Sequence, residues 1–205
     1  TGAGVCVGKP MAGLEVKVIP IDDQPIANWS DRLTLPTHKV GEIVVKGPQV
    51  TGAYLGRPKA NLQAKIKDGD AIYHRMGDLG YFDDQGNLWF CGRKSHRLET
   101  AQGQMFTVNC ESIFNQHSEV YRCALVGRGA RGSNQPVLFV EPFRELKPQE
   151  QQTLLEELRQ IAADHEDTKQ ITEFKLVKQL PTDTRHNAKI FREKLKHQLD
   201  QERAP

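Results

Sequence analysis

Two residues that could take part in a reaction lie at the two ends of one stretch of the sequence: a carboxylate, Asp78, and a guanidinium, Arg93. Asp78 directly follows Gly77, and Arg93 directly follows Gly92. A glycine allows backbone conformations in which the neighbouring side chain is presented to a ligand. A carboxylate accepts hydrogen bonds, and a guanidinium offers a fixed fork of donors. Taken alone, however, Asp78 is equally well a turn or strand-end cap, and Arg93 the partner in a surface ion pair.

The element that must position these two residues is a hairpin within residues 73–97. Two short aromatic-rich runs flank a polar turn that ends in Gly86 and Asn87, and the positive φ angles that such a pair supplies are typical of tight hairpins. A second turn is predicted at residues 75–78, where the sequence reads RMGD. The two predicted strands would place Asp78 and Arg93 at the two ends of the hairpin.

In the first half of the chain apolar residues alternate with polar ones, as in strands. The second half contains both this alternation and apolar residues at the spacing of a helix. Strands are predicted at residues 14–20, 40–47, 50–54, 105–108, 121–127, 136–141 and 171–180. Helices are predicted at residues 59–66, 109–117 (with Asn109 as N-cap), 147–165 and 186–201. We therefore predict an α+β fold in which a β-rich part, residues 1–93, precedes a small mixed α/β domain, residues 94–205.

The composition is that of an ordinary globular protein, with 38% hydrophobic and 26% charged residues and a net charge of +2. This charge is too small to indicate a nucleic-acid partner. The sequence has no apolar run near the roughly 18 residues of a transmembrane segment and does not begin with a signal peptide. Its four cysteines lack the spacing of a metal site, so we predict no metal ligands and buried thiols in the cytoplasm.

Four motifs in the order of the sequence resemble those of the acyl-adenylate-forming superfamily, which contains acyl-CoA synthetases, peptide-synthetase adenylation domains and luciferases. They are GEIVVKG at 41–47 (with TGAY at 51–54), RMGD at 75–78, GRKS at 92–95 and NAKIFR at 187–192. Each motif by itself is weak. Their common order identifies the chain as similar to this superfamily over most of its length.

The resemblance implies a role for each candidate residue. Asp78 would accept hydrogen bonds from the two ribose hydroxyls of ATP, and Arg93 would contact the ribose or the phosphates. Lys189 would bridge the substrate carboxylate and the α-phosphate, although taken alone it is one more exposed lysine on a charged helix. Ser95 falls at the superfamily's interdomain hinge. ATP and Mg²⁺ are the implied cofactors, with Mg²⁺ bound mainly by a part of the enzyme that these residues do not contain.

Within the superfamily, residues 92–127 and 183–195 resemble the β-lactone synthetases of bacterial long-chain olefin biosynthesis. Those enzymes adenylate a β-hydroxy fatty acid and close it to a β-lactone, releasing AMP and pyrophosphate. The segment after the hinge, HRLETAQGQMFT, departs from that of CoA-using members, which argues against a thioester product. A fatty-acyl-CoA ligase and, in another class, a non-catalytic binding module remain the alternatives.

The superfamily's Ser/Thr/Gly-rich phosphate loop and its aromatic-Gly-x-Thr-Glu motif are absent from this sequence, which starts at Thr1 without an initiator Met. We therefore expect a C-terminal portion that is inactive alone and shows no ATP–pyrophosphate exchange. Its expected partners are the N-terminal part of the same enzyme, a fatty-acid substrate and other enzymes of the olefin pathway.

Overall fold

The computed structural model describes residues 2–183 and 189–202, which fall into two compact units. One unit spans Ala3–Ser95, and the other comprises residues 1–2 and His96–Pro205. The first is β-rich and the second mixes helices with strands, as the sequence predicts. Each unit has its own hydrophobic core.

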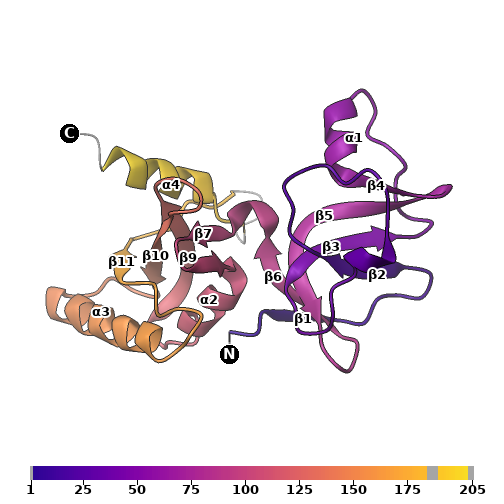
Figure 1. Ribbon diagram of the computed structural model, residues 1–205. Helices are drawn as coiled ribbons and strands as arrows, with labels where there is room; N and C mark the ends of the chain where they lie inside the picture. Colours follow the sequence, from indigo (N-terminus) through magenta and orange to yellow (C-terminus); the bar gives the residue numbers. More distant parts are fainter. Residues whose placement is uncertain (1, 184–188, 203–205) are drawn as a thin grey trace. The chain divides into compact units, whose positions relative to one another are not determined.

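In the described part of Ala3–Ser95, six antiparallel strands form one sheet (Figure 1). Along the sheet the strands are β1 (Val5–Gly8), β6 (Leu88–Arg93), β5 (Ala71–Phe82), β3 (Gly41–Lys46) and β2 (Glu15–Ile19), with β4 (Lys65–Asp68) paired to β5. The unit also contains helix α1 (Pro58–Ala64) and the short 3-10 helix η1 (Asp31–Leu33), and the 3-10 helix η2 (Lys94–His96) includes its last two residues. The predicted strands at 14–20 and 40–47 and the helix at 59–66 are confirmed, whereas residues 50–54 form no strand.

Strand β5 runs through the segment where a turn was predicted, so that prediction is wrong. Glu42 pairs with Leu79 and Val44 with Arg75, so β5 advances four residues where β3 advances two. The extra residues form a bulge at Gly77, whose φ is +70°. A bulge re-aims the neighbouring side chain without ending the strand. The glycine therefore redirects the chain at Asp78 and does not reverse it.

The hairpin between β5 and β6 is confirmed, but a side chain organises its turn. The Asp83 carboxylate accepts hydrogen bonds from the indole of Trp89 (2.9 Å), from Asn87 Nδ2 (2.9 Å) and from the amides of Gln85 and Asn87. These bonds, that of Trp89 first, lower the pKa of Asp83 to about 2. Gly86 has the expected positive φ of 78°, whereas Asn87 does not. A carboxylate that satisfies the turn's donors makes a second left-handed residue unnecessary.

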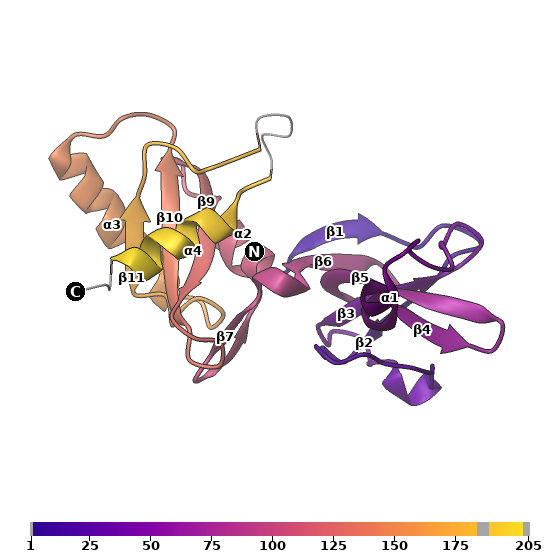
Figure 2. The same cartoon turned by 90° about the horizontal axis from the view of Figure 1, so that it is seen from above.

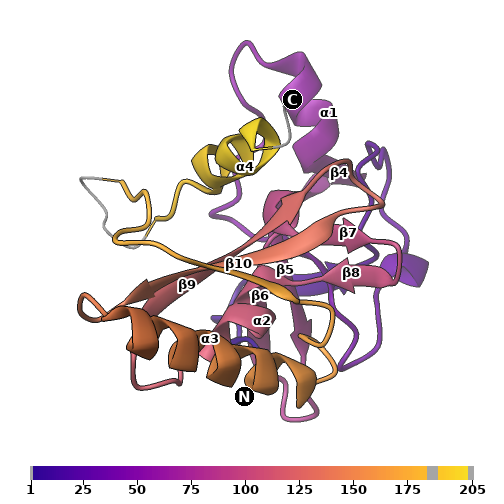
Figure 3. The ribbon, with the colours of Figure 1, turned by 90° about the vertical axis from the view of Figure 1, so that its left-hand side faces the viewer.

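The second unit is built on a sheet of three strands among its described residues, in which β10 (Gln135–Pro142) is antiparallel to β9 (Val120–Arg128) and parallel to β11 (Glu173–Leu176). Figures 2 and 3 show α4 (Arg192–Gln201) on one face of this sheet and α3 (Pro148–Ala163) on the other, where α2 (Thr107–Phe114) also packs. The strands β7 (Leu98–Thr100) and β8 (Gly103–Met105) form a separate hairpin.

Both faces of this sheet are covered, because successive residues of β9 and β10 belong alternately to two cores. Leu125 and Leu138 pack with the residues of α2 and α3, while Val126 and Phe139 pack with those of α4. A strand covered on both sides needs apolar residues at consecutive positions. This explains the unbroken apolar runs that the sequence places in β9 and β10.

Several predicted elements of this unit change their bounds. The predicted strand at 105–108 is wrong, since Met105 ends β8 and α2 begins at Thr107. Asn109 is no N-cap: it lies inside α2, and its buried amide donates to the carbonyl of Gly2 at 2.8 Å. The last helix starts at Arg192 and not at residue 186, because Lys189 and Ile190 are extended; residues 184–188 lie outside the described residues.

No disulfide joins the four cysteines, all of which the structure describes. Cys91, Cys110 and Cys123 are buried as predicted, and burial raises the pKa of Cys110 to about 12. Cys6 is exposed on β1, which corrects the prediction for that residue. None of the helices in the described ranges combines the length and the apolar character that crossing a bilayer demands.

Candidate functional site

Asp78 and Arg93 are brought together at the end of the hairpin, where β5 and β6 pair. They are register partners, and Arg93 Nη1 lies 3.0 Å from Asp78 Oδ1. Gly92, with a φ of +117°, precedes Arg93 just as Gly77 precedes Asp78. The Arg93 side chain is 57% exposed and that of Asp78 22% exposed. The carboxylate is thus partly sheltered while the guanidinium extends into solvent.

The Asp78 carboxylate retains acceptor capacity. Its Oδ1 is buried and accepts no hydrogen bond from any described residue, even though Arg93 Nη1 is within ion-pair distance. Burial raises the pKa of Asp78 above its ordinary value and outweighs the opposing attraction of Arg93. The side chain as a whole is 22% exposed, so a ligand with hydroxyl donors can still reach the carboxylate beside Arg93.

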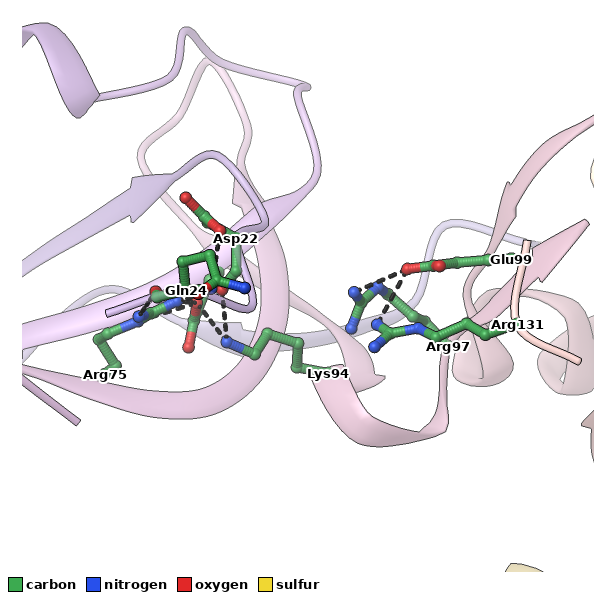
Figure 4. A network of polar contacts seen from close by, with 8 residues as sticks. Asp22, Gln24, Arg75, Lys94, Arg97, Glu99 and Arg131 are labelled. Atoms are coloured by element: carbon green, nitrogen blue, oxygen red, sulfur yellow. Dashed lines mark hydrogen bonds and ion pairs between the residues drawn. The ribbon is translucent and has the colours of Figure 1, made fainter. Parts of the chain in front are cut away.

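A buried ion cluster supports this site from within the same unit (Figure 4). Glu42 on β3 is 1% exposed, and its Oε2 accepts from Arg75 Nε at 3.1 Å and from Arg75 Nη2 at 2.7 Å. Lys94 Nζ reaches the same oxygen at 2.9 Å. One carboxylate oxygen therefore holds two cations that come from two other elements, β5 and η2.

The two cations also bind the loop that follows β2. Arg75 Nη1 donates to the carbonyl of Gln24 at 2.8 Å, Arg75 Nη2 donates to that of Asp22, and Lys94 Nζ reaches the latter at 2.9 Å. Figure 4 shows both side chains directed at this loop. Arg75 directly precedes the β5 bulge, and Lys94 directly follows Arg93. The cluster therefore fixes the backbone on both sides of the Asp78–Arg93 pair.

Sequence reasoning missed the roles of Glu42 and Arg75, although both lie inside the quoted motifs. A signal was available, since Glu42 is a charged residue at the start of the apolar strand GEIVVK. A charge in such a position is found buried only when it is paired. Its partner could not be read from the sequence, because Arg75 is 33 residues away.

Ser95 and Lys189 belong to different units of the chain. Ser95 is exposed in η2 and is the last residue of the unit Ala3–Ser95. Lys189 belongs to the other unit, which is described separately, and its side chain is exposed. The structure thus brings together Asp78 and Arg93, and it places Lys189 just before α4 in an extended segment.

No group of three or more His, Cys, Asp or Glu side chains that could hold a metal ion occurs among residues 2–183 and 189–202. Mg²⁺ is usually held by one or two carboxylates together with substrate phosphates. The Asp78 carboxylate has Arg93 as its neighbour, which suits an uncharged hydroxyl donor better than a cation.

The fold is that of the C-terminal portion of AMP-forming ligases. The amide bond synthetase of Marinactinospora thermotolerans superposes with a TM-score of 0.75 over 96% of this chain and 36% of that one, at 23% sequence identity. The o-succinylbenzoate CoA synthetase of Bacillus subtilis, solved with AMP, gives a TM-score of 0.69 over 93% of this chain and 35% of that one, also at 23% identity. No family model matches the chain.

At the level of sequence, the chain is similar to olefin β-lactone synthetases. It is 48% identical to that of Stenotrophomonas maltophilia over 199 residues and 47% identical to that of Xanthomonas campestris over 203 residues, each match covering 95% of this chain. A 2-succinylbenzoate–CoA ligase of Bacillus mycoides is 34% identical over 54% of it. The chain spans 36% of the length of the two β-lactone synthetases.

Proposed function

We propose that this chain is the C-terminal part of an ATP-dependent enzyme that adenylates a long-chain β-hydroxy fatty acid and closes it to a β-lactone. The observation that carries the proposal is the 48% identity with an olefin β-lactone synthetase across 95% of the chain. The likeness of the fold to adenylate-forming ligases supports the first half of that reaction. The cytoplasm, the remaining N-terminal part and other enzymes of olefin biosynthesis are the proposed setting and partners.

In the first step the substrate carboxylate attacks the α-phosphorus of ATP, and the bond to pyrophosphate breaks. In the second step the β-hydroxyl oxygen attacks the acyl carbonyl carbon. The bond to AMP breaks, the hydroxyl proton is lost, and a four-membered lactone and AMP are released. Mg²⁺ would neutralise charge on the phosphates and would be held mainly by the N-terminal part of the enzyme.

The proposed roles of the site residues are those that the resemblance to adenylate-forming enzymes implies. Asp78, whose side chain is 22% exposed, accepts the ribose hydroxyls with its carboxylate, and the exposed Arg93 contacts the ribose or the phosphates. Lys189 places its ammonium between the substrate carboxylate and the α-phosphate, where negative charge develops. Ser95 serves as the hinge between the end of the large domain, residues 1–93, and a mobile small domain, residues 94–205.

The product of the intact enzyme tests the proposed function. We expect a 3-hydroxy fatty acid and ATP to give AMP, pyrophosphate and β-lactone at equal rates with and without CoA, as measured by mass spectrometry. A matched fatty acid without the 3-hydroxyl should be adenylated without forming lactone. An acyl-CoA product that appears only when CoA is added would contradict the proposal and favour the acyl-CoA ligase, to which the partial match with 2-succinylbenzoate–CoA ligases also points.

Replacing Asp78 by asparagine is expected to weaken AMP binding to the intact enzyme. Hydrogen bonds to a charged acceptor contribute about 2 kcal/mol, which corresponds to roughly thirtyfold in Kd by calorimetry. Since bound hydroxyls favour the ionised carboxylate, wild-type affinity should fall as the pH drops through the raised pKa of Asp78, before an ordinary aspartate protonates. Asp84→Asn, an exposed change in the same hairpin, is the control. Equal affinities of the two variants would contradict the role of Asp78.

A further inference from the structure

Two segments, residues 181–183 and 189–191, pair with each other through their backbones. We call this pairing the base and the two segments its arms. The amide of Asp183 donates to the carbonyl of Lys189 at 2.9 Å, and the amide of Phe191 donates to that of Pro181 at 2.8 Å. Thr182 and Ile190 form the antiparallel bridge between these two bonds. The backbone of Lys189 is therefore set by its partners across the base, while its side chain remains exposed.

Arg192 ties one arm of this base to the core of the unit. Its Nη1 lies 2.6 Å from Glu111 Oε1 and its Nη2 lies 2.9 Å from Glu111 Oε2, a bidentate pair. Glu111 is buried on α2, and its Oε1 also accepts the amide of Leu125 at 2.7 Å. Arg192 Nη1 donates to the carbonyl of Leu125 at 3.2 Å. Planar bidentate pairing fixes the orientation of the guanidinium as well as its position.

A second buried carboxylate holds the other arm. Glu141 Oε2 accepts the amide of Leu180, directly before Pro181, at 2.7 Å. Arg122 Nε neutralises the same oxygen at 2.8 Å. Leu180 and Ile190 both pack with the core beneath α4. Glu141 thus connects the arm of residues 181–183 to the sheet, and Glu111 connects the arm of residues 189–191. The second connection is made through the side chain of Arg192.

We propose that Arg192, held by Glu111, is a positioning residue that sets the backbone of Lys189 for adenylate formation. This inference rests on the proposed function, in which Lys189 acts on the α-phosphate. Arg192 is only three residues from Lys189, and both intervening residues are bonded to or packed on fixed structure. A displacement of the reacting group by about 1 Å costs on the order of a hundredfold in rate. Loss of the bidentate anchor is sufficient to permit such a displacement.

The first test compares Arg192→Lys with Arg128→Lys in the intact enzyme. Arg128 is the control, because it also forms a bidentate pair, partly buried, with Glu173 in the same unit. We expect R192K to lower kcat for ATP–pyrophosphate exchange by about 10- to 100-fold with KM for ATP nearly unchanged. R128K should retain wild-type rates. Lys cannot replace the planar fork of Arg, so charge alone should not rescue the enzyme.

A double-mutant cycle separates positioning from general damage to the fold. If Arg192 acts only through Lys189, the variant K189A/R192K should be no slower than K189A alone. Losses that multiply, or an R192K enzyme as active as R128K, would overturn the inference. Should R192K fold poorly, E111Q/R192M replaces the pair while the glutamine still accepts the Leu125 amide, and the same loss of kcat is expected.

Hydrogen exchange on the 205-residue chain keeps the inference distinguishable from the proposed function. In R192K, and not in R128K, the amides of Asp183 and Phe191 should exchange faster while the amides of β10 stay protected. Unchanged protection of those two amides would overturn the positioning role even for an enzyme with full activity. Conversely, an intact wild-type enzyme that shows no ATP–pyrophosphate exchange would contradict the proposed function. The hydrogen-exchange data would still decide whether Arg192 fixes the backbone at Lys189.

Discussion

Replacing Lys189 with alanine in the intact enzyme is expected to slow adenylate formation by about 10²- to 10³-fold, the usual effect of removing one preorganised group that stabilises transition-state charge. Its exposed side chain extends from a backbone whose carbonyl is hydrogen-bonded to Asp183. The backbone at the start of the side chain is therefore fixed, which limits the positions that the ammonium can take toward the charge developing between carboxylate and phosphate. Because this interaction is made mainly in the transition state, kcat should fall while KM for ATP changes little.

Pyrophosphate exchange at saturating fatty acid measures this effect. Lys194→Ala is the control, since Lys194 is also exposed and close by, in the first turn of α4, where its Nζ lies 4.9 Å from the centre of the Phe191 ring. We expect that variant to stay within twofold of the wild-type rate. A K189A enzyme with wild-type kcat, or one whose defect is abolished by raising the ATP concentration, would remove Lys189 from the chemical step.

Replacing Glu42 with glutamine should destabilise the unit Ala3–Ser95 by about 3–5 kcal/mol, the cost of leaving buried charges without their partner. Arg75 is 2% exposed at its side chain and Lys94 18%, and both bind the same Glu42 oxygen. The neutral amide removes the negative charge that Glu42 supplies to both cations of the cluster. Since the cluster holds the backbone on both sides of Asp78 and Arg93, nucleotide binding should weaken as well.

Urea denaturation followed by tryptophan fluorescence reports on this unit selectively, because both tryptophans of the chain, Trp29 and Trp89, lie within it. Asp84→Asn removes an exposed pair with His38 and should leave the unfolding midpoint nearly unchanged. Equal unfolding midpoints for the Glu42 and Asp84 variants would show that the buried cluster contributes no more than a surface ion pair.

Local patterns were sufficient for much of the fold. The strands β2 and β3 could be predicted from the alternating apolar residues of 14–20 and 40–47, although four consecutive residues of β3, 41–44, are buried and not only those of one face. The bulge at Gly77 could not be told from a turn, since a glycine with positive φ is compatible with both. The start of α4 was placed too early, because the pairing of Lys189 and Ile190 with residues 181–183 overrides their helical spacing.

The order of the four motifs, the α+β class and the choice of Asp78, Arg93 and Lys189 as proposed site residues follow from the sequence alone, because each depends on residue types and short spacings. The contacts that support these residues depend on the tertiary structure. Glu42 meets Arg75 across 33 residues, and Glu111 meets Arg192 across 81. A buried charge requires a partner, but the choice among many distant candidates depends on how the strands and helices pack.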